Sequence, residues 1–193
     1  MSKLYFRYGA MNSGKSTHLM QVAHNYEERG MNVLLLKPAT DKKGGDKIVS
    51  RLGVDRNVDM LISDEDNLLL KLAEPIKMNK PHCIIVDEVQ FLKKHHIDEL
   101  FQVAIENNIP VICYGLRTDF LINGFEGSER LLLIAHSIEE MKTICTCGNK
   151  AILNGRKLNG KYIFEGAQVA IDSVDNIEYQ SLCGECYFKH KED

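Results

Sequence analysis

Short apolar runs alternate with helical patterns along the first part of the chain. Runs typical of buried strands occupy residues 4–8, 31–37, 83–87, 111–115 and 131–135. Between them, apolar residues recur every three or four positions and predict helices after residue 16, around residues 68–72 and over residues 97–105. Strands that alternate with helices are typical of a parallel sheet covered by helices on both faces. The pattern therefore predicts an α/β fold.

The pattern changes near residue 141, where cysteine pairs and short β-rich segments begin. Two Asn-Gly pairs, at 154–155 and 159–160, predict tight turns in this part of the chain. We therefore expect residues 1–140 to form the α/β domain and residues 141–193 to form a second, smaller lobe. Within the first domain, the polar, glycine-containing stretch 41–46 (DKKGGD) predicts a mobile loop of the kind that closes over substrates.

Composition and charge narrow the classes of function. The 193 residues are 44% hydrophobic and 26% charged, enough for a packed core, and the net charge is −3. This mild acidic excess argues against nucleic acid or a membrane surface as the main partner. No signal-peptide pattern is visible, and no apolar run approaches the roughly 18 residues of a membrane span, so we expect a cytoplasmic protein. In that reducing compartment, the six cysteines are better explained as free thiols or metal ligands than as disulfides.

Residues 9–16 read GAMNSGKS, the full G-x-x-x-x-G-K-S pattern of a phosphate-binding loop between a strand and a helix. Its glycines let backbone N–H groups wrap a phosphate, and the helix that follows points its positive end at the same anion. Lys15 is expected to reach the β- and γ-phosphates, and the Ser16 hydroxyl to bind Mg²⁺. A surface turn with an incidental lysine is the alternative. The pattern predicts that a nucleoside triphosphate is bound by Gly9, Ala10, Met11, Asn12, Ser13, Gly14, Lys15 and Ser16.

Two adjacent acids, Asp87 and Glu88, follow the apolar run that begins at Cys83. An aspartate at the carboxyl end of a buried strand is where a phosphate-loop enzyme holds Mg²⁺, so Asp87 is the candidate for that role. Glu88 is placed to accept a proton from an attacking hydroxyl or water, which contributes about 10²- to 10⁴-fold in rate. Gln90 is assigned to the same nucleotide site. The alternative is a solvated pair of acids at the end of a strand.

Four cysteines form a C-x-C pair, Cys145 and Cys147, and a C-x-x-C pair, Cys183 and Cys186. Two such pairs suit a tetrahedral Zn²⁺ site. Four thiolates leave no open position for water, so the zinc is expected to be structural. The first pair is shorter than the usual C-x-x-C, and four free thiols are the alternative.

Taken together, four features resemble the type II thymidine kinase family, the bacterial and cytosolic kind: GAMNSGKST, VDEVQF, YGLRTDF and the two cysteine pairs. They span essentially the whole chain in the family's order, and the C-x-C variant is similar to the enterobacterial branch. The resemblance implies a P-loop NTPase-type parallel sheet flanked by helices, with a small C-terminal β-rich zinc lobe. A long "lasso" loop between Cys147 and Cys183 would close over the nucleoside. ATP, Mg²⁺, structural Zn²⁺, thymidine as substrate and a homotetramer are further implications.

Matched position by position, the resemblance assigns more roles. Glu88 becomes the base for the 5′-hydroxyl of deoxyribose. The family has an Asp-x-Arg in the loop after the second strand, and the matching residues here are Asp41-x-Lys43. Asp41 is assigned to substrate binding, whereas Lys43 lacks the planar fork with which arginine makes a bidentate phosphate contact. Arg156 corresponds to an arginine of the lasso. Leu116 and Phe120 could also be core residues near a strand end. The family lines its thymine pocket at the positions of Met11, Phe91, Leu116, Phe120 and Tyr179.

Three other functions are open at this stage. A GTPase would need Asn-Lys-x-Asp after the magnesium strand, whereas residues 79–82 (NKPH) precede that strand and lack the acid. A zinc-ribbon nucleic-acid binder would explain the cysteines but not the phosphate loop. A kinase that acts on another deoxynucleoside is the closest alternative.

Overall fold

The computed structural model describes residues 2–41, 45–49, 53, 55–168 and 176–192. The first part of the chain forms β1 (Leu4–Tyr8), α1 (Lys15–Glu27), β2 (Val33–Pro38), β3 (Lys47–Val49), β4 (Asp55–Asn57), β5 (Met60–Ile62), α2 (Leu68–Asn79), β6 (Cys83–Val86), the 3-10 helix η1 (Val89–Phe91), α3 (Lys94–Glu106), β7 (Val111–Gly115), α4 (Glu126–Ile134) and β8 (Ser137–Glu140). The C-terminal part forms β9 (Thr143–Ile144), β10 (Lys150–Ala151), β11 (Leu153–Leu158), β12 (Lys161–Ile163), β13 (Ile177–Leu182) and α5 (Gly184–Glu192).

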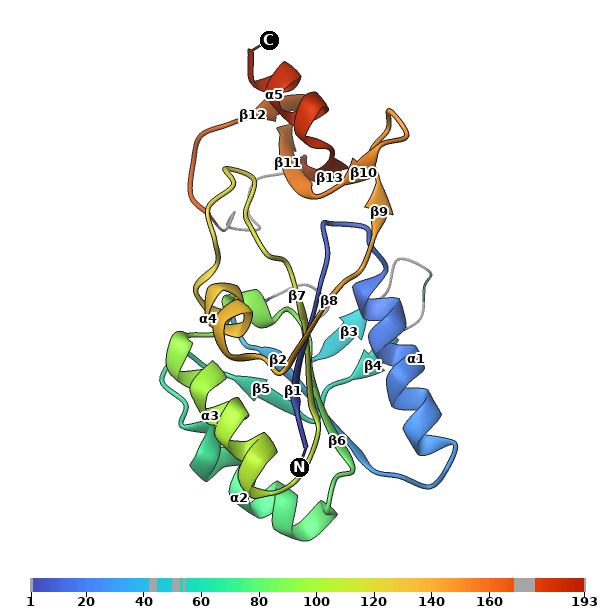
Figure 1. The fold of residues 1–193 in the computed structure, drawn as a ribbon, viewed down its shortest axis with the longest axis vertical. Helices are drawn as coiled ribbons and strands as arrows, with labels where there is room; N and C mark the ends of the chain where they lie inside the picture. Colours follow the sequence, from blue (N-terminus) through green and yellow to red (C-terminus); the bar gives the residue numbers. More distant parts are fainter. Residues whose placement is uncertain (1, 42–44, 50–52, 54, 169–175, 193) are drawn as a thin grey trace.

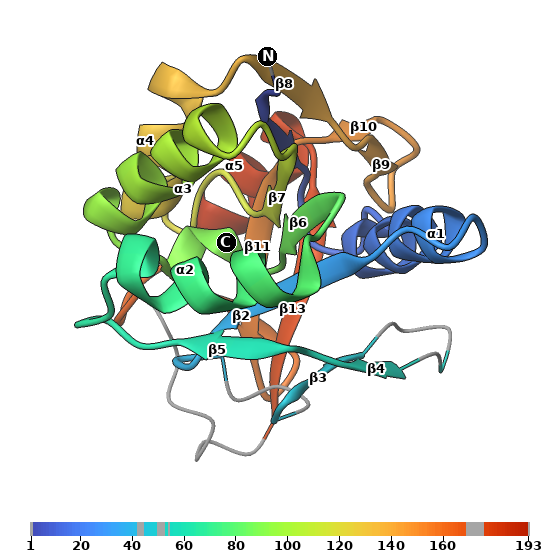
Figure 2. The ribbon, with the colours of Figure 1, turned by 90° about the horizontal axis from the view of Figure 1, so that it is seen from below.

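Six strands form one sheet in the order β5-β2-β6-β7-β1-β8, and every neighbouring pair is parallel. Parallel neighbours need crossover connections, which helices usually supply. Figures 1 and 2 show α1 on one side of the sheet and α2, α3 and α4 on the other. The predicted α/β fold, a parallel sheet flanked by helices, is confirmed.

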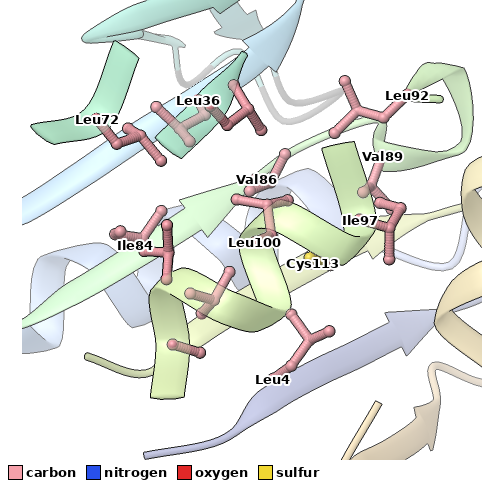
Figure 3. Packing of buried hydrophobic residues seen from close by; sticks show 14 of the residues in the cluster. Leu4, Leu36, Leu72, Ile84, Val86, Val89, Leu92, Ile97, Leu100 and Cys113 are labelled. Atoms are coloured by element: carbon pink, nitrogen blue, oxygen red, sulfur yellow. The ribbon is translucent and has the colours of Figure 1, made fainter. Parts of the chain in front are cut away.

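Both faces of the sheet are apolar because its strands send alternate side chains into two cores. In β2, Leu34 and Leu36 join the cluster under α2 and α3, whereas Leu35 joins the cluster that includes α1. Figure 3 shows the first cluster, in which Leu72 of α2 and Leu100 of α3 pack with side chains of the strands. Burying each such leucine stabilises the fold by about 1.5–3 kcal/mol. The two cores therefore hold the strand ends, and the loops that follow them, in fixed positions.

The prediction of a strand over residues 131–135 is wrong, because α4 runs through most of this segment. Leu131 is fully buried while Leu133 is 77% exposed, as in a helix with one face on the core. A short apolar run cannot be assigned by periodicity alone, and here Glu126 and Glu129 in the first turn favour a helix. The edge strand beside β1 is instead β8, whose sequence SIEE is mostly polar.

The C-terminal part extends beyond the end of the sheet that carries the phosphate loop (Figure 1). Strand β11 lies between β12 and β13 in an antiparallel sheet, and β9 pairs with β10. The predicted division at residue 140 falls between β8 and β9 and stays a prediction. Among the described residues of this part, one cluster of buried hydrophobic side chains consists of Cys145, Ala151, Leu153, Leu182, Cys183 and Tyr187.

Only one of the two predicted Asn-Gly turns forms. Asn159 and Gly160 join β11 to β12 with φ of 51° and 80°. Asn154 and Gly155 lie inside β11 instead, so that prediction is wrong. Gly155 is required there by packing, since an added Cβ would lie 2.7 Å from Leu182 Cδ1.

The predicted loop at 41–46 lies partly outside the described residues, because residues 42–44 are not among them. Within the part of the chain that is described, no helix combines the length and apolar character needed to cross a membrane.

Candidate active site

The phosphate loop, residues 9–16, connects β1 to α1. Gly9 is packed so closely that an added Cβ would lie 2.3 Å from Ser13 Oγ and 2.5 Å from the Met141 carbonyl oxygen. Gly14 has φ of +78° directly before α1, in a region that L side chains rarely adopt. The two glycines are therefore needed for different reasons, close packing at Gly9 and backbone conformation at Gly14.

Lys15, the first residue of α1, is 8% exposed and turns its ammonium group back into the loop. Its Nζ donates to the carbonyl oxygens of Ala10 at 3.0 Å and Gly9 at 3.3 Å, and to Ser13 Oγ at 3.4 Å. The start of α1 adds the positive end of the helix dipole. Positive charge is thus concentrated where the loop's backbone N–H groups can wrap a phosphate.

Asp87 directly follows β6 and reaches towards the phosphate loop. Its N–H donates to the Leu36 carbonyl at 3.0 Å, and its Oδ2 accepts from Ser16 Oγ at 3.5 Å. Burial first, then repulsion from Glu88 and a smaller repulsion from Asp41, raise the pKa of Asp87 to about 7. A divalent cation between this carboxyl and the Ser16 hydroxyl would offset the repulsion. The pair is therefore suited to holding Mg²⁺.

Glu88 has φ of 47° and ψ of 38°, the left-handed region that non-glycine residues rarely adopt. Such backbone strain persists where the surroundings enforce it, often at functional sites. The Glu88 N–H donates to Asp87 Oδ1 at 3.0 Å, and its carboxylate accepts from Gln90 Nε2 at 2.5 Å. Glu88 is partly exposed while Asp87 is buried, so the two acids have different access to a substrate.

Gln90 is 3% exposed and uses both ends of its side-chain amide. While Nε2 donates to Glu88, Oε1 accepts from the Leu116 N–H at 3.0 Å. Gly115 makes this approach possible, because an added Cβ would lie 2.5 Å from Gln90 Oε1. These contacts orient Glu88, and the assignment of Gln90 to the nucleotide stays a prediction.

The structure brings two of the predicted pocket residues, Phe120 and Tyr179, to a single guanidinium group. Arg156 Cζ lies 3.7 Å from the centroid of the Phe120 ring, and its Nε donates to Tyr179 Oη at 2.9 Å. Phe91, immediately after the acids, packs edge-on against Phe125 at a centroid distance of 5.9 Å. Phe120 is 1% exposed, so its ring is fully buried in this structure.

Asn154 was missed by sequence reasoning, which interpreted it as part of a turn. It is 3% exposed, accepts a hydrogen bond from the Met11 N–H at 2.7 Å through Oδ1, and donates from Nδ2 to the Thr118 carbonyl at 3.1 Å. A second hydrogen bond joins the C-terminal part to the phosphate loop: Thr143 Oγ1 in β9 donates to the Asn12 carbonyl at 3.4 Å. One side chain of β11 therefore connects the phosphate loop to the segment that follows β7.

Asp41 lies just after β2, where its Oδ2 is 3.0 Å from Lys37 Nζ. Its negative charge is the smallest of the effects that raise the pKa of Asp87. Lys43, the other half of the predicted Asp-x-Lys pair, lies outside the described residues.

The four predicted cysteine ligands come together: the Sγ atoms of Cys145, Cys147, Cys183 and Cys186 all lie within 4.8 Å of one another. Sulfurs at about 2.3 Å from a tetrahedral Zn²⁺ are about 3.8 Å apart, so the group fits zinc. The short C-x-C pair is accommodated by Gly148, which has φ of +88°. Burial opposes ionisation of Cys145, but hydrogen bonds from the backbone at Cys147 and Cys183 outweigh it and lower its pKa to about 6. A thiolate is the form that binds metal.

Comparison with known proteins decides between the functions that this geometry allows. The family described as "Thymidine kinase" matches residues 2–187. The chain belongs to the thymidine kinase family. A protein named "Thymidine kinase" from Haemophilus influenzae is 46% identical over 194 residues, which cover 96% of this chain and 100% of the relative. Relatives of the same name from Rhodopirellula baltica and Streptococcus gordonii are 45% and 43% identical and cover 95% and 98% of this chain, and 86% and 97% of their own lengths.

Membership of the thymidine kinase family makes the chain an ATP-dependent nucleoside kinase, a transferase that phosphorylates thymidine. The resemblance stated from the sequence is thereby confirmed. Solved structures add little: the Bacteroides Pif1 protein bound to single-stranded DNA has a TM-score of 0.38 and 14% identity, covering 72% of this chain and 38% of that one. A likeness this weak carries no argument.

Proposed function

We propose that the chain transfers the γ-phosphoryl group of ATP in line to the 5′-hydroxyl of thymidine, and so makes dTMP for nucleotide salvage. Deoxyuridine is a second proposed acceptor. The arrangement of Glu88 carries this proposal. Its partly exposed carboxylate is held by Gln90 and lies beside the buried Asp87, whose own carboxylate accepts from Ser16 of the phosphate loop. An acceptor hydroxyl needs a base close to the phosphate that it attacks.

Phosphate binding follows from the loop. Backbone N–H groups of residues 9–16 hold the β- and γ-phosphates, and Lys15 neutralises part of their charge. Ser16 and Asp87 would hold Mg²⁺. When bound, Mg²⁺ neutralises negative charge on the phosphates and fixes them for in-line attack. Support comes from the 3.5 Å Ser16–Asp87 contact and from the raised pKa of Asp87.

Glu88 acts as the general base. As the 5′-oxygen attacks the γ-phosphorus, its proton passes to the Glu88 carboxylate, and the bond between the γ-phosphorus and the β,γ-bridging oxygen breaks to release ADP. Gln90 keeps one carboxylate oxygen in a fixed direction by its hydrogen bond of 2.5 Å. The Leu116 N–H fixes Gln90 in turn.

The nucleoside lies between the sheet and the C-terminal part. The proposed pocket is lined by Met11, Phe91, Leu116, Phe120 and Tyr179, and Asp41 also binds the substrate. The segment between Cys147 and Cys183 closes over it and keeps water from accepting the phosphoryl group. Zn²⁺ on the four cysteines supports that segment. We further propose a homotetramer that works in the cytoplasm, in line with the family resemblance.

A panel of nucleosides tests the reaction. ATP consumption by the purified protein with Mg²⁺ should rise strongly with thymidine and deoxyuridine and little with deoxycytidine or deoxyguanosine. Preference for one of the latter two would replace thymidine by another deoxynucleoside. Stimulation by DNA or RNA instead of a nucleoside would overturn the kinase assignment.

A further inference from the structure

Arg156, in the middle of β11, is a buried cation whose described partners are all uncharged. It is 3% exposed and takes part in none of the ion pairs formed by the described residues. Its three nitrogens donate to Tyr179 Oη at 2.9 Å, the Ala167 carbonyl at 2.8 Å and the Gln168 carbonyl at 3.0 Å. The face of the guanidinium lies over the Phe120 ring, 3.7 Å from its centroid.

A buried guanidinium is costly unless its donors are bonded. Arginine suits this position because its planar fork can serve three acceptors at its edge while its face stacks on an aromatic ring. Arg156 therefore joins three separate stretches: Tyr179 on the neighbouring strand, Phe120 in the loop after β7, and residues 166–168, which we name the cap segment. Any movement of the cap segment away from β11 would leave donors of a buried cation without partners.

The cap segment is also attached on its other side. Gln168 Nε2 donates to the Gly124 carbonyl at 3.0 Å, in the same loop that carries Phe120. From α5, Tyr187 Oη donates to the Phe120 carbonyl at 2.7 Å. Phe120 is thus held by Arg156 on its ring and by Tyr187 on its backbone. Arg156 therefore connects the cap segment, the Phe120 loop and β13.

We propose that Arg156 is a positioning residue for the nucleoside: it locks the cap segment, Phe120 and Tyr179 into one wall of the thymidine pocket. This inference rests on the proposed function, which places Phe120 and Tyr179 in that pocket. None of the hydrogen bonds and ring contacts described for Arg156 reaches the phosphate loop. Arg156 should therefore govern the KM for thymidine and leave the KM for ATP unchanged.

The test compares Arg156→Met, which keeps side-chain length but removes all donors, with Arg156→Lys, which keeps the charge but not the fork. Lys157→Met is the matched control, because Lys157 is the adjacent basic residue and its Nζ lies over the Tyr162 ring at 4.7 Å instead of in the pocket. We expect Arg156→Met to raise the thymidine KM about tenfold or more, because it loses all the hydrogen bonds that the charged guanidinium donates. Arg156→Lys should raise the thymidine KM less, because the ammonium group keeps the charge and can still donate. The ATP KM should stay within about twofold.

Hydrogen–deuterium exchange of the peptide that covers residues 159–168 supplies a readout that needs no substrate. Arg156→Met should exchange there at least about tenfold faster than the wild type and the Lys157→Met control, with bound zinc unchanged. An unchanged thymidine KM together with unchanged exchange would overturn the inference. Equal rises in the KM for thymidine and the KM for ATP, together with loss of bound zinc, would show a purely structural role of Arg156 and would also overturn the inference. A wild type that ignores thymidine would contradict the proposed function, while the exchange measurement would still test the lock.

Discussion

The central sheet and the C-terminal part of this chain are stabilised in different ways. The sheet lies between two large apolar clusters, one under α2 and α3 and one that includes α1. The C-terminal part has a small cluster among the described residues, and two of its members, Cys145 and Cys183, belong to the cysteine group. So small a core offsets little of the conformational entropy of its chain. The cysteine group, once it binds metal, supplies the missing stabilisation.

This difference in stabilisation matches the different roles that the two parts have in the proposed reaction. The sheet carries the phosphate loop and the two acids, which must keep their geometry through the reaction. In the proposed mechanism, the C-terminal part carries Arg156, Tyr179 and the cap segment, which would close over the nucleoside. With a well-packed sheet under the reacting groups and a cover stabilised by metal, the proposed cover could move without disturbing the phosphates.

Metal removal should separate the two parts most sharply. With a zinc chelator, amides of β11 and β13 should exchange orders of magnitude faster, while those of β1, β6 and β7 keep their protection, because metal binding in such sites supplies about 10–16 kcal/mol. Hydrogen–deuterium exchange with mass spectrometry measures both. Cys183→Ser should behave like the chelated protein, whereas Cys83→Ala, outside the cysteine group, should keep its metal. Equal loss of protection in both parts would mean that the stability of the sheet also depends on the metal.

Glu88→Gln should lower catalysis without changing the C-terminal part. The neutral amide is similar in size but cannot take the proton, so kcat should fall by about 10²- to 10⁴-fold. ADP affinity, measured by calorimetry, should stay close to that of the wild type, and the exchange of β11 and β13 should not change. Normal turnover by this variant would remove Glu88 from its role as the base.

Asn154→Ala tests the junction between the two parts. It leaves the Met11 N–H and the Thr118 carbonyl without their described partners, at a cost of about 1–3 kcal/mol for an unsatisfied buried group. The melting temperature should fall by about 2–4 °C per kcal/mol, and ADP affinity should weaken several-fold. Glu178→Ala, an exposed position on β13, is the control and should change neither. If ADP affinity is unaffected while stability falls, Asn154 supports the fold and not the phosphate loop.

The sequence predicted those features whose geometry depends on neighbouring residues. The phosphate loop is one continuous stretch between a strand and a helix, so its spacing identifies it. The prediction failed at residues 131–135 and at Asn154, where local preference was ambiguous. An apolar run of a few residues fits either a strand or a helix, and an Asn-Gly pair fits a turn until packing against Leu182 and Tyr162 places it inside a strand.

By itself, the sequence determined the fold class, the phosphate loop, the acid pair and the four cysteines, because each is encoded by periodicity or by short spacing. Only the tertiary structure decided which distant groups meet: Asn154 with Met11, Arg156 with Phe120, and Gln90 with Leu116. These contacts join residues far apart in the chain. They arise because the ends of parallel strands converge at one edge and the C-terminal part packs over that edge, which no local pattern records.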